Sequence, residues 1–256
     1  MSQPALSPWQ RNLVLGIQRF IYWLSKHWLA MVNLFILVYV GLPFAAPVLM
    51  KAGWTAPARV VYTIYKPLCH QLAFRSWFLF GEEPVYPRAE YEARVGMNGA
   101  RWPELFAQAR EFVGGGTTGY KVGLCERDVA TYAALFLAGL TYAVLRRRGL
   151  RPMPFWLFIL VGVLPIGLDG GSQFVSLFIS AVPARESVWQ LRVLTGGLFG
   201  LSIAWLAYPY IQEGMDDSAA VLAGRYGWDG HAQAPEADQP TTRDKVVQLL
   251  EDKDLI

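Results

Sequence analysis

Charged residues are scarce in this chain of 256 residues: Asp, Glu, Lys and Arg together make up 17% of it. Soluble globular proteins carry about 25%. Hydrophobic residues reach 54% and there are ten tryptophans, so the composition indicates a chain that faces lipid and excludes a disordered one. The formal net charge of +3 is spread over both signs, and nucleic acid is therefore not an expected partner.

Several motifs that would identify other functions are missing. The run Gly114–Gly116 is not followed by Gly-Lys-Ser/Thr, which excludes a phosphate-binding loop. The three histidines, at positions 27, 70 and 231, are scattered, which argues against a bis-histidine haem. No short apolar core with a small-residue cleavage site precedes the first long apolar segment, so we expect that segment to be a retained anchor.

Four apolar segments predict membrane-spanning helices, because a span needs roughly 20 predominantly apolar residues. The clearest lies between Lys26 and Lys51, and the others cover residues 129–145, 152–168 and 193–212. Residues 170–184 are apolar but short and predict a partial or re-entrant helix. The fold class is therefore all-α: a polytopic helical membrane protein with about four transmembrane helices plus interfacial or re-entrant helices.

Three regions follow from this pattern. Residues 1–27 predict an amphipathic interfacial helix, since apolar residues recur on one helical face. Residues 28–212 form the transmembrane domain, with an extracytoplasmic loop at residues 81–124 in which a short helix is expected to begin at Trp102. This loop is either a lid or a solvated linker. Residues 213–256 form a polar cytoplasmic tail, which ends in a docking helix or is poorly ordered.

Arginine and lysine set the expected orientation. Arg146, Arg147, Arg148 and Arg151 crowd one short loop, and basic residues also precede the first span. Short cytoplasmic loops are enriched in these residues, so both regions are expected in the cytoplasm. An even number of crossings then separates them, and Arg59–Phe80 is expected to lie at the outer surface. The alternative is that this segment crosses. The predicted location is the inner (cytoplasmic) membrane, multi-pass, with both termini cytoplasmic and the lipid bilayer as partner.

Polar residues from four separate stretches are expected near the outer ends of these helices. Ionisable groups close to hydrocarbon are costly and are usually paired or functional. Pro67 is expected to start a helix whose N-terminus stabilises a Cys69 thiolate. Gln71 and Arg75, which are four residues apart, would share one face of that helix. The candidate polar site consists of Cys69, His70, Gln71, Arg75, Cys125, Arg127, Asp169, Gln173 and Arg192, with Asp128 beside them.

The two cysteines allow three interpretations. A Cys69–Cys125 disulfide is permitted in an oxidising exterior. A metal, with zinc as the candidate cofactor, could be held by Cys69, His70, Cys125 and Asp169, whose ligand types are suitable although no paired metal-binding spacing is present. The third interpretation is two unconnected thiols. Asp169 is either a metal-binding or proton-handling carboxylate or one half of an ion pair with Arg192.

At these residues the sequence resembles a family of uncharacterised bacterial and archaeal integral membrane proteins. The resemblance is carried by Cys-His-Gln at 69–71 with Arg75–Ser76, by Cys-x-Arg at 125–127, by Pro-x-x-x-Asp-Gly-x-x-Gln at 165–173, and by Arg192 with Thr195–Gly196. It covers roughly residues 30 to 210. It implies a multi-span membrane fold and a set of motifs, without an activity.

Two functions compete. The first is an integral membrane protein with an extracytoplasmic polar site that binds a metal or acts on an anionic, lipid-like ligand through Arg75, Arg127 and Arg192. The alternative is a non-catalytic subunit of a larger membrane complex, with a structural Cys69–Cys125 disulfide. A proton-coupled transporter ranks last, because Asp169 is its only support and no inverted repeat is visible. No catalytic residue is assigned.

Overall fold

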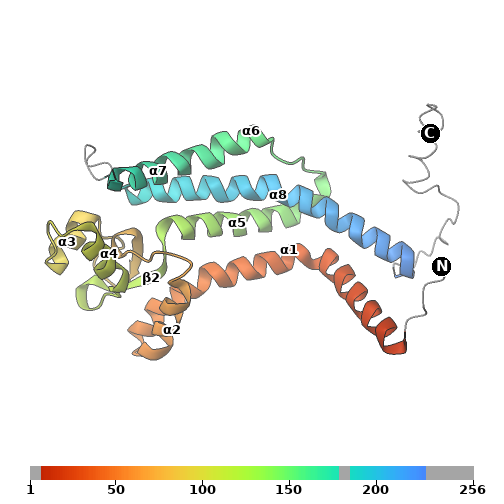
Figure 1. Cartoon of the computed structure of the whole chain (residues 1–256), viewed down its shortest axis with the longest axis horizontal. Helices are drawn as coiled ribbons and strands as arrows, with labels where there is room; N and C mark the ends of the chain where they lie inside the picture. The colour runs from red at the N-terminus through yellow and green to blue at the C-terminus, as the bar shows by residue number, and fades with distance from the viewer. Residues whose placement is uncertain (1–6, 179–184, 229–256) are drawn as a thin grey trace. The chain divides into compact units, whose positions relative to one another are not determined.

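The computed structural model describes residues 7–178 and 185–228, and Figure 1 shows them as helices with one small sheet. Four helical runs in this part of the chain are long and apolar enough to cross a membrane. They are α1 (Pro8–Lys51), α5 (Glu126–Leu145), the continuous run of α6 (Phe155–Leu157), η4 (Phe158–Val163) and α7 (Leu164–Phe178), and α8 (Trp189–Tyr226). The predicted all-α polytopic fold with four spans is confirmed.

The segment Arg59–Phe80 does not cross. Its only α-helix is part of α2 (Thr55–Tyr65), which has 11 residues and is thus about 16 Å long, against the roughly 30 Å of a bilayer core. The alternative of a crossing segment is therefore wrong.

No helix begins at Pro67 either, so the expected N-terminal position of the Cys69 thiolate is also wrong. The backbone N–H groups of Leu68 and Cys69 both bond to the carbonyl of Tyr65 and close the end of α2. Gln71 then takes a left-handed conformation with φ of 52°. The chain continues as the 3-10 turn η1 (Ala73–Arg75) and strand β1 (Ser76–Leu79), so Gln71 and Arg75 do not share a helix face.

The expected partial helix after Gly170 is wrong for the residues that the structure describes. Residues 170–178 are the last turns of α7 and continue the third span. The glycine pair is compatible with a helix here because Gly170 packs closely on Arg127, whose Nη1 would lie 3.1 Å from an added Cβ. Earlier in the same span, η4 is a π-helical segment that ends just before Pro165, where the proline removes a backbone donor.

The described residues between 29 and 212 form one compact unit, and residues 7–28 belong with residues 213–228 to another. In the second unit the rings of Tyr22 and Trp228 pack edge to face at 5.4 Å. Residues 8–28 are not a separate helix but the first part of α1. Their interfacial location stays a prediction, and the expected linker and helix of the tail lie outside the described residues.

Small residues bring the helices of the larger unit into close contact. A Cβ on Gly200 of α8 would lie 2.2 Å from the backbone oxygen of Thr131 in α5, and one on Gly196 would lie 2.5 Å from that of Arg127. The Gly-x-x-x-Gly pair therefore serves helix packing. Gly139 of α5 likewise accommodates Asn33 of α1.

The predicted loop at residues 81–124 is part of a folded cap, which we define as residues 66–124. It contains α3 (Arg88–Val95), α4 (Trp102–Glu111) and η2 (Gly116–Thr118), and β1 pairs antiparallel with β2 (Tyr120–Cys125). The short helix expected at Trp102 is confirmed. The cap has its own core, which excludes a merely solvated linker; this core contains Leu72, Ala73, Phe74, Phe78, Tyr86, Tyr91, Leu105 and Ala109.

Candidate functional site

The start of α5 distributes three consecutive side chains to three different clusters. Strand β2 ends at Cys125, and Glu126, Arg127 and Asp128 form the first turn of α5. Successive residues of a helix diverge by about 100°, so these three side chains cannot meet at one point. Asp128 joins the cysteines, Arg127 pairs with α7, and Glu126 pairs with α8.

The first cluster brings the two cysteines together. The Sγ atoms of Cys69 and Cys125 and a carboxylate oxygen of Asp128 all lie within 4.8 Å of one another. The backbone N–H of Cys125 donates to Cys69 Sγ at 3.3 Å. Both cysteines are free thiols, 7% and 5% exposed, and they lie in a hydrophobic cluster built from α1, α2, β2 and α5.

The pKa values of the two cysteines are shifted in opposite directions. A hydrogen bond from Cys125 lowers the pKa of Cys69, burial opposes this shift, and hydrogen bonding and charge from His70 add to it. The same interaction with Cys69 raises the pKa of Cys125, as does burial. The arrangement therefore favours a Cys69 thiolate that accepts a hydrogen bond from the Cys125 thiol.

Asp169 lies in a second cluster, apart from the cysteines. Its carboxylate pairs with Arg127 and, at 3.3 Å, with Arg185. Gln173 lies one turn further along α7 and donates to the Asp169 carbonyl at 2.9 Å. Of the four predicted metal ligands, the structure thus brings Cys69 and Cys125 together and places Asp128, rather than Asp169, beside them. The His70 side chain is not one of these three mutually close groups, and its Nδ1 accepts from the backbone N–H of Leu72 at 3.4 Å.

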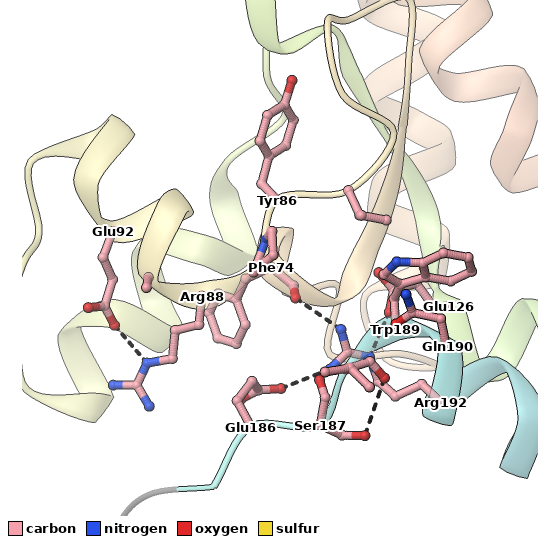
Figure 2. A pocket seen from close by; sticks show the side chains of 14 residues that line it. Phe74, Tyr86, Arg88, Glu92, Glu126, Glu186, Ser187, Trp189, Gln190 and Arg192 are labelled. Atoms are coloured by element: carbon pink, nitrogen blue, oxygen red, sulfur yellow. Dashed lines mark hydrogen bonds and ion pairs between the residues drawn. The ribbon is translucent and has the colours of Figure 1, made fainter.

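The third cluster is a buried chain of ion pairs (Figure 2). Arg75 binds Glu186 through two contacts of 2.6 and 2.8 Å. Arg192 contacts Glu186 at 3.2 Å and Glu126 at 2.6 Å. The expected pairing of Arg192 with Asp169 is wrong, because Arg192 is on the side of α5 that carries Glu126. The side chains of Arg192 and Glu126 are only 5% and 1% exposed.

This chain of ion pairs lines a cavity of about 660 Å³ between the cap and the start of α8. Phe74, Val85 and Trp189 supply apolar walls, and Figure 2 shows Arg192 pointing toward Glu126 and Glu186. Arg88, which also lines the cavity, pairs with Glu92 at 2.6 Å. Each charged side chain of the lining is thus in an ion pair, and the one for Glu186 includes Arg75 from outside the lining.

Lys121 is a further functional candidate that the sequence did not reveal. Its side chain is buried, with 1% exposed, although lysine is almost never fully buried. Its Nζ donates to the carbonyls of Gln71 at 2.7 Å, Arg110 at 2.7 Å and Ala109 at 3.3 Å. Burial lowers its pKa to about 7. The only signal in the sequence is a lone lysine within the apolar strand YKVGLC.

Comparison with known proteins supports the expected resemblance. Residues 112–206 match a family described as "Predicted membrane protein (DUF2085)". This match includes Cys125, Arg127, Asp169, Gln173 and Arg192, whereas Cys69 precedes it. The chain is also 20% identical over 195 residues to "Uncharacterized protein MJ1492" of Methanocaldococcus jannaschii, which covers 74% of this chain and 96% of that protein.

No solved structure matches the chain. The four apolar helices and the two sequence matches agree with each other. The chain is therefore a multi-pass membrane protein that is similar to a family of membrane proteins of unknown function, as its motifs predict.

Proposed function

We propose that this membrane protein holds a zinc-like divalent metal between its cap and its helical bundle. The ligands are Cys69, Cys125 and Asp128, and His70, which follows Cys69 in the chain and helps to lower its pKa, is the candidate for a fourth position. The observation that carries the proposal is the convergence of three ligand atoms within 4.8 Å from segments 56 residues apart.

The ligand chemistry and the spacing both fit such a metal. Thiolate, imidazole and carboxylate groups are the ligands of protein zinc sites, and zinc–sulfur bonds of about 2.3 Å place tetrahedral ligands roughly 3.8 Å apart. The cluster needs only a slight contraction to reach this spacing. Because a metal ligand is a thiolate, binding would displace the proton that the two sulfurs share.

The burial of the cluster favours a structural role for the metal. Structural zinc sites are closed, whereas catalytic sites keep an open coordination position. Here the sulfurs lie in a hydrophobic cluster of α1, α2, β2 and α5. A metal at this point would tie the end of α2 and the loop that follows it to the start of α5, and thus the cap to the bundle.

The distribution of arginines supports an extracytoplasmic location for the cap. Arg146–Arg148 form η3 at the opposite end of α5 from the cysteines, and short arginine-rich loops are typically cytoplasmic. On the outer side an unprotected pair of neighbouring thiols would meet an oxidising environment. A bound metal would keep them reduced, and a disulfide is the competing outcome.

The ion pairs disfavour the anionic-ligand interpretation at the arginines first considered for it. Arg75 and Arg192 pair with Glu186, Arg192 also pairs with Glu126, and Arg127 pairs with Asp169. An anion would have to displace these carboxylates. The non-catalytic subunit with a Cys69–Cys125 disulfide remains the second candidate, because the same proximity that suits a metal also suits oxidation.

Metal analysis of the full chain, purified in detergent without chelator, tests the proposal. We expect about one metal per chain, lost in Cys69→Ser, Cys125→Ser and Asp128→Asn. Asp169→Asn is the matched control and should keep its metal. The proposal is wrong if the wild type holds no metal even after incubation with zinc, or if Asp169→Asn loses as much as Asp128→Asn. Thiols that resist alkylation until reductant is added would instead establish the disulfide.

A further inference from the structure

A second cavity, of about 290 Å³, lies on the other side of the cap, where α2 meets α4 and β2. Four cationic side chains line it, and Glu111 is the only acidic one among the lining residues. The cations are Arg59, Lys66, Arg110 and Lys121. Unlike the larger cavity, whose charged side chains are all in ion pairs, this cavity has two arginines outside its Lys66–Glu111 pair. It also has Lys121, which is partly protonated at neutral pH because burial lowers its pKa to about 7.

The cations are held in place by the fold and are only partly neutralised by it. Glu111 forms an ion pair with Lys66 at 2.7 Å, and its charge also acts at longer range on Lys121 and Arg110. Lys121 and Arg110 donate to uncharged backbone carbonyls, including an Arg110–Lys66 bond of 2.8 Å. Arg59 has no side-chain partner among the described residues. Within the described part of the chain, these three cations therefore have no direct ion pair.

Two buried polar atoms at this cavity also lack a hydrogen-bond partner among the described residues. They are Nε of Arg110, which is a donor, and Oε1 of Gln71, which is an acceptor. Gln71 itself is 1% exposed, and its amide nitrogen already donates to the Tyr62 carbonyl at 2.9 Å. Buried polar atoms without partners are costly. Both residues line the cavity, so a small shift of either side chain would let a ligand with acceptor oxygens and a hydroxyl satisfy this pair.

The exposed side chains of helix α2 suit a position next to the bilayer surface. Arg59, Thr63 and Lys66 recur at helical spacing along its cavity side. Val60 and Ile64 are 57% and 53% exposed on another side. Trp54, which precedes the helix, is 66% exposed. Exposed apolar and tryptophan side chains of this kind are typical of a helix lying in the lipid headgroup region.

We propose that the cavity lined by Arg59, Arg110 and Lys121 binds a small phosphate group that carries a hydroxyl, from a lipid headgroup or a soluble phosphate ester. Multiple cationic donors suit the oxygens of a phosphate. At about 30 Å³ per water-sized group, the volume holds roughly ten non-hydrogen atoms, as in a glycerophosphate. This site is separate from the proposed metal site, and neither requires the other.

Binding measurements on the full chain in detergent test this proposal. The probes are phosphatidylglycerol, with diacylglycerol as its phosphate-free counterpart, and soluble glycerol 3-phosphate, with bound species counted by native mass spectrometry. We expect phosphatidylglycerol or glycerol 3-phosphate to bind and diacylglycerol not to. Displacement of the lipid by glycerol 3-phosphate identifies the phosphate group itself as the ligand, and binding of the lipid alone identifies a headgroup held with its chains.

Substitutions on both sides of the cavity locate the site. Loss of one charge-assisted contact should weaken binding about tenfold, so we expect this effect in Arg110→Met and in Arg59→Met. Arg59 is exposed and has no side-chain partner among the described residues, so its variant should fold even if Arg110→Met does not. Arg101→Met is the matched control, because Arg101 lies just before α4 with its side chain 83% exposed and should leave binding within twofold of the wild type.

The proposal is overturned by either of two results. One is that neither phosphate-bearing probe binds at millimolar concentration. The other is that Arg101→Met weakens binding as much as Arg59→Met does, which would indicate attraction by surface charge alone.

Discussion

The buried pair Arg192–Glu126, at one end of the chain of ion pairs, predicts an unequal loss of stability when one or the other partner is removed. Arg192→Met leaves Glu126, whose side chain is 1% exposed, with no other ion-pair or side-chain hydrogen-bond partner among the described residues. Removing one member of a buried pair costs about 3–5 kcal/mol, because the other charge stays buried alone. We therefore expect Arg192→Met to lose free energy of unfolding at the upper end of that range.

Glu126→Gln should be much milder. Arg192 keeps its contact with Glu186 at 3.2 Å and with the carbonyls of Ser187 and Phe74, and a glutamine oxygen can still accept from its Nε. The loss should resemble that of a single hydrogen bond to a charged group, about 1.5–3 kcal/mol. The double variant Glu126→Gln/Arg192→Met removes both charges and should recover part of the loss seen in Arg192→Met alone.

Reversible unfolding in mixed detergent, followed by tryptophan fluorescence, measures these differences. Arg101→Met provides the baseline, since an exposed pair contributes about 0–1 kcal/mol. If Glu126→Gln costs as much as Arg192→Met, or if the double variant is less stable than both, the assignment of Glu126 as a carboxylate dependent on Arg192 is refuted.

Three further predictions concern packing, protonation and orientation. Gly200→Leu should cost about 1–3 kcal/mol in unfolding, because its Cβ would meet a backbone carbonyl of α5, whereas Gly197→Leu, with nothing within 4 Å, should be neutral. The pKa of Lys121 is lowered from 10.5 to about 7 in the folded protein. Between these two pH values the unfolded chain binds more protons than the folded one, so the free energy of unfolding should rise with pH. In Lys121→Met, pH-dependent melting should show a smaller rise over this window. Impermeant thiol reagents on intact cells should label Arg101→Cys and not Arg148→Cys.

The spans and their order could be predicted from the sequence because length, apolar content and the arginine-rich loop constrain them strongly. The short outer helix was also predictable, since Trp102–Pro103–Glu104 opens it. The end of α7 could not be predicted, because the pair Gly170–Gly171 resembles a break in the helix. In the structure the helix continues, and Arg127 packs closely against Gly170.

The sequence predicts which segments come together at the candidate site, but not which side chains of those segments lie close enough to act as ligands. The topology brings Cys69 and Cys125 to one end of the bundle, as the sequence suggests. Whether Asp128 or Asp169 joins them depends on the direction in which α5 leaves β2, and a change of one residue turns a side chain by about 100°. Lys121 could not be identified, because nothing local indicates that three carbonyls from the cap surround it.

X-ray absorption at the zinc edge, on the full chain loaded with one equivalent of zinc, tests the central claim most directly. The proposed ligands Cys69, Cys125 and Asp128 predict two sulfur neighbours at about 2.3 Å and oxygen or nitrogen neighbours at about 2.0–2.2 Å. Asp128→Asn should weaken the metal's retention and Asp169→Asn should leave the spectrum unchanged. A first shell made only of oxygen and nitrogen would contradict the claim.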